Sequence, residues 1–305
     1  MTASAGSPGD TILVTGSSTG LGLETAIYLA KRGFNVYATV RDIAAEPKVQ
    51  QAASDRGVSL KVLELDITDQ SSIETAVNQI IEEAGSIYGL VNNGGIGLRG
   101  CLEDLADDEI RQVFETNVFG TIAVTKAVLP HMRAAGRGRV LTVSSVGGRI
   151  SSFGVSMYCA SKFALEGFGE ALALEIAPFG LQSVLIEPGI IDTTRWTTHR
   201  GLAEGAMDPE SPYYRMFQVS EVMSDEVVAR SKTTAADVGK AIHTALTVET
   251  PKMRYIVGKP ASAVVKLRRL LPEPFFEKVY FGGMVKRLEK EAAEAEAPPA
   301  STVTQ

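Results

Sequence analysis

The feature that most constrains the fold is an alternation of short apolar runs with longer amphipathic segments. The apolar runs, which predict strands, span residues 11–16, 34–40, 60–65, 86–91, 139–143, 182–186 and 254–257. The segments between them have helical spacing, at 22–31, 72–83, 107–133, 158–177 and 235–247. Strands rich in Val, Ile and Leu, each followed by a helix, form parallel sheets covered on both faces. We therefore expect an α/β fold, a single-domain doubly wound parallel sheet of about seven strands.

The chain divides into a flexible N-terminus at 1–9, the α/β domain at 10–258, a helical extension at 259–290 and a disordered tail at 291–305. The tail is rich in Ala, Glu and Pro, which do not form a packed core. Within the domain, residues 190–232 carry aromatic and methionine side chains without a strand pattern. Such a long segment is typical of a lid over a binding site, and a small satellite core is the alternative.

Composition excludes several classes of function. With 30 basic and 36 acidic residues the net charge is −6, whereas a nucleic-acid-binding protein is usually basic. The sequence has no run of about 18 apolar residues, so we expect no transmembrane segment. Two cysteines do not make a disulfide framework, and three scattered histidines lack metal-ligand spacing. We therefore expect a soluble, cytoplasmic protein without a metal site.

The predicted extension at 259–290 is charged differently from the whole chain. It holds eight basic and three acidic residues, mixed with bulky apolar residues at helical spacing. This pattern suits a helix that lies on a membrane surface. The alternative, which we favour, is a set of helices packed over the binding cleft with their lysines facing solvent. Peripheral membrane contact through this extension stays open.

A glycine-rich turn follows the first predicted strand. Gly16, Gly20 and Gly22 let the backbone turn sharply and approach a bound group closely. The helix that follows offers unpaired N–H groups and a partial positive charge to a pyrophosphate. Glycines also occur in purely structural turns, but the place of this turn in the first βα unit favours a dinucleotide site.

The end of the second predicted strand distinguishes between NAD(H) and NADP(H). An NAD site usually has a carboxylate there for the ribose hydroxyls, whereas an arginine accommodates the 2′-phosphate of NADP. Here Val40 takes the place of the acid, and Arg41 follows it. Ser17 and Ser18 offer hydroxyl donors to the same phosphate. We therefore expect NADP(H), with NAD(H) as the alternative if Asp42 reaches the ribose.

Tyr158 and Lys162 stand four residues apart on a predicted helix, which places them on one face. A free phenol has a pKa of about 10 and is a poor base at neutral pH. Because a neighbouring ammonium group favours the phenolate, we expect Lys162 to lower the pKa of Tyr158. Ser145, at the carboxyl end of the fifth predicted strand, can donate a hydrogen bond to a substrate oxygen. This set suits proton transfer to or from a carbonyl or alcohol oxygen.

These motifs occur together in one known family. Along the chain stand Thr15-Gly-x-x-x-Gly-x-Gly22, Asn92-Asn-Gly-Gly95, Asn117, Ser145, Tyr158-x-x-x-Lys162 and Pro188-Gly189. Over residues 10–258 the chain resembles the compact branch of the short-chain dehydrogenase/reductase superfamily, which has a Rossmann fold. Residues 158–167 look most similar to the hydroxysteroid and retinol dehydrogenases. One departure is Gly94, where the family usually has alanine, and we expect a slightly looser turn there.

The resemblance implies a catalytic set of Asn117, Ser145, Tyr158 and Lys162. Tyr158 would donate or accept the proton, Ser145 would hold the substrate oxygen, and Lys162 would also bind the nicotinamide ribose. Asn117 would position a water that relays protons through Lys162.

The resemblance also implies contacts of Asp66 with the adenine, of Asn93 with the adenosine ribose, and of Thr193 with the nicotinamide carboxamide. The full set of expected cofactor contacts is Gly16, Ser17, Ser18, Gly20, Leu21, Gly22, Arg41, Asp66, Ile67, Asn93, Tyr158, Lys162, Pro188, Gly189, Ile191 and Thr193. The expected substrate contacts are Ser145, Phe153, Val155, Tyr158 and Trp196.

We expect an NADP(H)-dependent oxidoreductase that interconverts an alcohol and a ketone or aldehyde on a lipophilic substrate. An NAD(H)-preferring dehydrogenase of the same family is the alternative, and a non-catalytic NADP-sensing protein is the competing class. The spacing of the glycines disfavours a sugar-nucleotide epimerase. The resemblance further implies a homodimer or homotetramer built on the long helices near 107–133 and 158–177.

Overall fold

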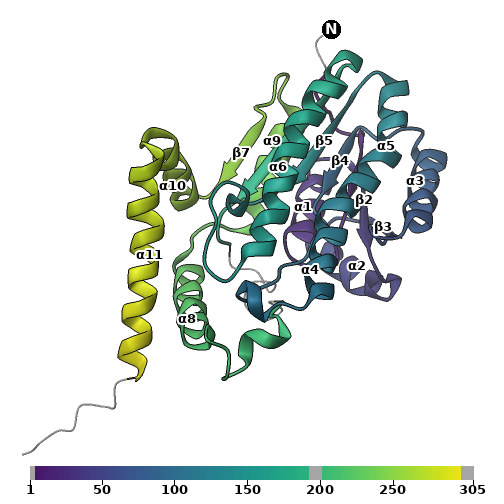
Figure 1. The fold of residues 1–305 in the computed structure, drawn as a ribbon. Helices are drawn as coiled ribbons and strands as arrows, with labels where there is room; N and C mark the ends of the chain where they lie inside the picture. Colours follow the sequence, from purple (N-terminus) through teal and green to yellow (C-terminus); the bar gives the residue numbers. More distant parts are fainter. Residues whose placement is uncertain (1–3, 192–200, 297–305) are drawn as a thin grey trace, which may run out of the picture.

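The structure, a computed structural model, describes residues 4–191 and 201–296. In that part of the chain lies a seven-stranded sheet with every pairing parallel and with strand order β3-β2-β1-β4-β5-β6-β7 (Figure 1). The strands are β1 (Thr11–Val14), β2 (Asn35–Val40), β3 (Lys61–Glu64), β4 (Gly89–Asn92), β5 (Gly138–Val143), β6 (Leu181–Pro188) and β7 (Arg254–Val257). The predicted parallel sheet is confirmed, with strand ends shifted by a few residues.

Helices cover both faces of the sheet. One face carries α1 (Gly20–Ala30), α2 (Glu46–Ser54) and α9 (Ala235–Thr247), and the other carries α3 (Gln70–Ala84), α5 (Thr121–Ala135) and α6 (Ser156–Ile176). The alternation of side chains along each strand explains why there are two cores. Ile12 and Val14 of β1 belong to the core under α1, and Leu13 belongs to the core under α6. The predicted double winding is therefore confirmed.

Parallel pairing brings the carboxyl ends of neighbouring strands to one edge of the sheet. The glycine turn follows β1, Arg41 follows β2 and Asp66 follows β3. The strand order reverses between β1 and β4, and beyond that point Asn93 follows β4 and Ser145 follows β5. In open α/β sheets this reversal at the carboxyl edge is where ligands bind.

The segment 107–133, predicted as one helix, forms two. α4 (Asp107–Phe114) and α5 are joined by a wider π-helical turn over Glu115–Gly120. A Cβ atom on Gly120 would lie 2.8 Å from the backbone oxygen of Ile67, so this turn passes very close to the chain after β3. π-turns within helices are frequent at functional sites, and this one carries Asn117.

Among the residues that the structure describes, two helices are not predicted from the sequence, α2 and α8 (Tyr214–Arg230). α8 lies in the segment predicted to be a lid and buries only Phe217 and Val228, which is too sparse for a periodic signal. Phe217 belongs to a small core separate from the two main ones, with Leu98, Cys101, Val113, Ala203 and Ala206. For Phe217, the alternative prediction for residues 190–232, a small satellite core, is therefore the correct one.

The C-terminal extension is a pair of helices, α10 (Lys259–Leu270) and α11 (Glu273–Glu296). α11 continues into the stretch from 291 that we predict to be disordered. Alanine and glutamate are strong helix formers, and ion pairs four residues apart join Arg287 to Glu291 and Lys290 to Glu294. Residues 291–296 are therefore helical and not disordered as predicted.

α10 and α11 pack against the rest of the domain. Val265 of α10 and Phe276 of α11 form a small core with Ile150, which lies shortly after Ser145. α11 also lies beside α8 (Figure 1). In residues 4–191 and 201–296, no helix is both long enough and apolar enough to cross a membrane.

We expect Thr234→Ala to lower the free energy of unfolding by about 1 kcal/mol, because Thr234 caps α9. Its Oγ1 accepts a hydrogen bond from the backbone N–H of Asp237, and the Asp237 carboxylate accepts one from the backbone N–H of Thr234. Urea denaturation measures the loss. Thr244→Ala, at a partly exposed position of the same helix, is the control, and an equal loss in both variants would contradict the capping role.

Candidate active site

The turn between β1 and α1 is shaped for the close approach of a ligand. Gly16 and Gly20 have φ angles of +67° and +59°, in the left-handed region that favours glycine. A Cβ atom on Gly22 would collide with the Gly16 carbonyl oxygen and the Asn93 side chain. A Cβ atom on Gly20 would meet no described atom within 4 Å, so the space in front of the turn is open.

Asn93 and Thr15 hold this turn in place. Nδ2 of Asn93 donates to the carbonyl oxygens of Thr15 (3.0 Å) and Gly16 (3.1 Å). Oγ1 of Thr15 accepts from the backbone N–H groups of Asn93 (3.0 Å) and Gly94 (2.9 Å). A Cβ atom on Gly94 would lie 3.0 Å from Cδ1 of Ile67, so the Ile67 side chain occupies much of the space that an alanine methyl would need. The missing methyl therefore does not leave a void in the turn.

α1 begins at this open space with uncapped N–H groups. Thr19 is its N-cap residue, and the Thr19 side chain makes no capping hydrogen bond within the described part of the chain. Uncapped N–H groups and the helix dipole attract an anion. The turn and the first turn of α1, which includes Gly20, Leu21 and Gly22, therefore fit the pyrophosphate of a dinucleotide.

The end of β2 lies beside the glycine turn, where the backbone N–H of Ser17 donates to the Thr39 carbonyl oxygen (2.7 Å). Val40 is buried in the core. Arg41 is exposed and has no hydrogen bond or ion pair to any described residue. Asp42 caps the following turn by accepting from the Ala44 backbone N–H (2.9 Å) and does not pair with Arg41.

The two predicted serines of the turn differ in orientation. The Ser17 hydroxyl donates to the Val14 carbonyl oxygen (3.0 Å), and the residue is fully buried. Its hydroxyl is therefore directed into the protein, unlike our expectation of a phosphate donor. Ser18 is partly exposed at the turn, so its side chain stays accessible to a ligand.

Ser145 and Tyr158 are brought together at the carboxyl end of β5. Ser145 precedes a short 3-10 turn, η4 (Val146–Gly148), and its Oγ accepts from the Gly147 backbone N–H (3.0 Å). Tyr158 lies in the first turn of α6 and shares a hydrogen bond with the Ser145 hydroxyl. A Cβ atom on Gly147 would lie 3.4 Å from both the Ser145 Oγ and the Tyr158 ring, so η4 and α6 approach closely here.

Lys162 is buried one turn after Tyr158 on α6. Its Nζ donates to the Val143 carbonyl oxygen (3.0 Å) and lies 5.7 Å from the centroid of the Tyr158 ring. A Cβ atom on Gly95 would lie 3.9 Å from this Nζ and 3.0 Å from Oδ1 of Asn117. The four residues of the expected catalytic set therefore gather on one side of β4 and β5.

Asn117 is held tightly by its neighbours. Its Oδ1 accepts from the Ile96 backbone N–H (2.7 Å), and its Nδ2 donates to the Ile96 carbonyl oxygen (2.9 Å) and to the Ser161 Oγ (3.1 Å). These contacts fix the π-helical turn to the loop after β4 and to α6. Positioning of a water by Asn117 stays a prediction.

The electrostatic environment of Tyr158 corrects one expectation. Burial raises the pKa of Tyr158 to about 12; the hydrogen bond with Ser145 opposes this shift, and Cys159 adds to it. We expected the Lys162 ammonium to lower this pKa. The Lys162 Nζ donates to the Val143 carbonyl oxygen and lies over the Tyr158 ring, 5.7 Å from its centroid, and the loss of water around Tyr158 prevails. Tyr158 is therefore a neutral phenol at physiological pH.

The remaining predicted cofactor residues lie at the same edge. Asp66 accepts from the backbone N–H (2.9 Å) and hydroxyl (2.7 Å) of Thr68, which closes the turn after β3. Pro188 ends β6, and the Gly189 backbone N–H donates to the Val257 carbonyl oxygen (2.8 Å). Ile191 is buried in the core under α1. Thr193 lies outside the described residues.

The predicted substrate contacts lie near the small core. Val155 forms an isolated bridge with Gly100, and Phe153 packs against the core that contains Phe217. Both directly precede α6, the helix that carries Tyr158. Trp196 lies outside the described residues.

Two residues at this site are absent from the expected contacts. Thr15 clamps the glycine turn, and the sequence signal is its place at the start of the glycine motif. The Ser161 hydroxyl donates to the Tyr158 carbonyl oxygen (2.7 Å) and accepts from Asn117. Its position between Tyr158 and Lys162 does not by itself reveal these bonds.

Comparison with known proteins places this site in a family. The profile of the short chain dehydrogenase family matches residues 10–202. Human 17-beta-hydroxysteroid dehydrogenase type 1 is 36% identical over 265 residues, covering 84% of this chain and 80% of that protein. Human retinol dehydrogenase 8 is 38% identical over 212 residues, or 67% of each chain. A solved short-chain dehydrogenase from Streptomyces avermitilis superposes with a TM-score of 0.71 at 29% identity, covering 96% of this chain and 100% of that one.

These matches confirm the resemblance that the motifs carry, including its hydroxysteroid and retinol dehydrogenase-like group. The chain belongs to the short-chain dehydrogenase family and is an oxidoreductase of alcohols and carbonyls that binds a nicotinamide cofactor.

Proposed function

We propose that the protein is an NADP(H)-dependent oxidoreductase that interconverts an alcohol and a ketone or aldehyde on a lipophilic substrate. The observation that carries this proposal is the gathering of Ser145, Tyr158 and Lys162 at the carboxyl edge beside the glycine turn. A hydroxyl donor, a phenol and an ammonium group close together are what transfer of a proton to a carbonyl oxygen requires.

Tyr158 acts as the proton donor when the carbonyl is reduced. Its raised pKa keeps the phenol protonated at neutral pH, and the shared hydrogen bond keeps the Tyr158 and Ser145 hydroxyls together. We propose that both contact one substrate oxygen. The nicotinamide, when bound, supplies the hydride. Ser145 polarises the carbonyl, and Tyr158 protonates the oxygen as negative charge develops on it.

Lys162 and Asn117 have supporting roles in this step. The Lys162 ammonium is held by Val143, and we propose that it also binds the ribose of the nicotinamide. The hydrogen bonds of Asn117 to Ile96 and Ser161 hold its side chain in place beside Lys162 and Gly95.

The preference for NADP(H) rests on the end of β2. A buried valine at position 40 offers no carboxylate to the ribose hydroxyls, and the exposed Arg41 guanidinium is free to bind a phosphate. Asp42 is engaged in capping, which weakens the case for NAD(H).

Two observations support a lipophilic substrate. Phe153, which packs against the small core of Phe217, and Val155, which is bridged to Gly100, are apolar side chains that directly precede the helix of Tyr158. The names of two relatives, a hydroxysteroid dehydrogenase and a retinol dehydrogenase, refer to lipophilic alcohols. We therefore propose steroid-like or retinoid-like alcohols and carbonyls as the first compounds to screen.

Tyr158→Phe removes the proton donor, so we expect kcat to fall by about 10²- to 10⁴-fold with little change in NADPH affinity. The assay is NADPH oxidation with a panel of steroid, retinoid and aliphatic carbonyls. Tyr28→Phe, on α1 away from the site, is the matched control. Full activity of the Tyr158 variant would contradict the mechanism.

Arg41→Ser should reduce the ratio of kcat/KM for NADPH to that for NADH by about 10- to 100-fold, because a charge-assisted bond to the 2′-phosphate is lost. Lys48→Ser, an exposed cation on α2, should leave the ratio unchanged. A wild-type enzyme that prefers NADH would overturn the assignment of Arg41 and favour the NAD(H) alternative.

We also propose a homo-oligomer built on α5 and α6. Leu174 of α6 is 78% exposed, and Phe163 on the same helix and Phe119 before α5 are exposed as well. Burial of such side chains against a second copy is favourable. In gel filtration, we expect wild-type dimers or tetramers and a monomeric Leu174→Glu variant, with Val222→Glu on α8 as the control. A monomeric wild type would contradict this proposal.

A further inference from the structure

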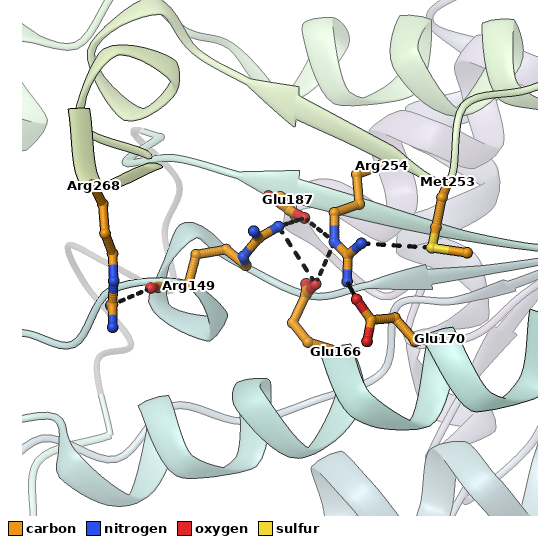
Figure 2. A network of polar contacts seen from close by, with 7 residues as sticks. All are labelled: Arg149, Glu166, Glu170, Glu187, Met253, Arg254 and Arg268. Carbon is orange, nitrogen blue, oxygen red and sulfur yellow. Dashed lines mark hydrogen bonds and ion pairs between the residues drawn. The ribbon is translucent and has the colours of Figure 1, made fainter. Parts of the chain in front are cut away.

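A buried cluster of charged side chains lies behind the site, and the proposed reaction does not use it. Figure 2 shows Arg149, Glu166, Glu187 and Arg254, which come from four different segments of the chain. Glu187 has no exposed surface, and Glu166 is buried as well. Charged groups are costly to bury, so each needs partners of opposite charge.

The two carboxylates and two guanidinium groups form a closed arrangement. Glu187 pairs with Arg149 (3.0 Å) and with Arg254 (3.1 Å). Glu166 pairs with Arg254 (2.9 Å) and lies 4.0 Å from Arg149. Arg254 also pairs with Glu170 (2.6 Å), whose side chain is exposed. Glu187 therefore bridges both arginines at the centre of the cluster.

Three members of the cluster, Arg149, Glu166 and Glu187, are attached to segments that carry the site. Arg149 follows η4, the turn that begins after Ser145. Glu166 lies one turn beyond Lys162 on α6, two turns beyond Tyr158. Glu187 directly precedes Pro188, at the end of β6. The cluster therefore joins the turn after Ser145, the helix that carries Tyr158 and Lys162, and the end of β6 at Pro188.

The C-terminal extension joins the same cluster. Arg268 of α10 donates to the backbone carbonyl oxygen of Arg149 at 2.6 Å (Figure 2). Arg254 lies in β7, the strand that leads into α10. The extension is therefore connected to η4 directly through Arg268 and to β6 through β7.

The pKa of the Glu187 carboxyl lies well above its usual range. Burial raises its pKa to about 7, and the Glu166 carboxylate adds to this, while Arg149 and Arg254 oppose it. The charged groups that face it are Arg149 after η4, Glu166 on α6 and Arg254 in β7, with Glu170 beyond Arg254. Protonation removes one negative charge from between the two arginines and weakens their hold on η4.

We propose that Glu187 is a positioning residue for the reaction: through Arg149 and Arg254 it holds the Ser145 turn, the Tyr158 helix and the end of β6 in one arrangement, to which Arg268 attaches the C-terminal helices. This inference rests on the proposed function. A small displacement of reacting groups lowers a catalytic rate strongly, so the cluster acts on kcat more than on substrate binding.

The test compares Glu187→Gln with Glu170→Gln in the full chain. Both remove a carboxylate that pairs with Arg254, but only Glu187 is buried and bridges to Arg149. With NADPH and a lipophilic ketone that the wild type reduces, we expect kcat of Glu187→Gln to be about tenfold lower at about pH 8, with KM changed less than kcat. Glu170→Gln should stay within about twofold of the wild type.

The pH profile separates positioning from general weakening of the structure. Wild-type kcat should rise with an apparent pKa near 7, as Glu187 ionises. Glu187→Gln should lack this rise and match the wild-type value at low pH, while Glu170→Gln should keep it. A Glu187→Gln variant with the wild-type kcat and profile overturns the proposal, as does an equal loss in Glu170→Gln.

A second pair of variants tests the extension. Arg268→Gln removes the bond to the Arg149 carbonyl oxygen, and Arg269→Gln, at the exposed next position, removes an equal charge. Arg268→Gln should lower kcat severalfold and Arg268→Lys should restore part of it, while Arg269→Gln has no effect. Equal activity of Arg268→Gln and the wild type overturns the role of Arg268.

Hydrogen exchange in the protein without substrate gives a readout independent of activity. In Glu187→Gln the amides of 146–150 and of Gly189 should exchange faster, while those of β1 and α1 stay unchanged. If the wild type reduces no carbonyl in the panel, the proposed function fails, but the exchange result still decides whether Glu187 positions these segments. Unchanged exchange at 146–150 overturns the proposal.

Discussion

Parallel pairing of the strands is the constraint on which the site depends. Because all seven strands run in one direction, the residues that follow β1 to β6 meet at one edge, although they are far apart in the sequence. The reversal of strand order between β1 and β4 opens that edge to a ligand. Asn93 then joins the two sides of the reversal by donating to the carbonyl oxygens of Thr15 and Gly16. The cofactor turn and the catalytic set are thus fixed to one scaffold.

Burial governs the chemistry of this scaffold in two places. At Tyr158 the loss of water keeps the phenol neutral, which suits a proton donor. At Glu187 burial raises the pKa to about 7 in spite of two arginine partners. The first group faces the site, and the second lies behind it and joins the segments that carry Ser145, Tyr158 and Pro188. Buried ion pairs often contribute little to the free energy of folding, because burying the charges is costly. We therefore propose that this cluster serves to hold the segments in one arrangement.

Most of the fold can be predicted from the sequence, because the hydrophobic periodicity and the residues that begin and end helices and turns indicate the same elements. Buried strands bounded by glycines, and helices such as α9 with its capping box at Thr234, are recognisable from local pattern alone. α2 and α8 are not predicted, because each buries only two side chains and so lacks a clear helical pattern of apolar residues. The extent of α11 is misjudged because its last residues are held by ion pairs on the helix surface and not by a core.

Some features of the site can be predicted from the sequence and others cannot. Motif spacing identifies Tyr158, Lys162 and Ser145, since helix and strand geometry place them directly. It misjudges the Ser17 hydroxyl, which donates to the Val14 carbonyl oxygen three residues away and not to a ligand. It also misjudges the pKa of Tyr158, because that pKa depends on burial in the folded protein. The cluster around Glu187 has no local signature at all: its members are separated by between 17 and 105 residues and meet only in the folded protein.

Isotope transfer is the measurement that decides whether this edge of the sheet carries out hydride chemistry. The enzyme would be given a lipophilic ketone and NADPH deuterated at C4, with the two faces labelled in separate reactions. We expect one of the two labels to appear on the carbinol carbon of the product alcohol, and Tyr158→Phe to suppress its formation. Alcohol that carries neither label, or no alcohol at all across the panel, would contradict the assignment of this site as a hydride-transfer centre.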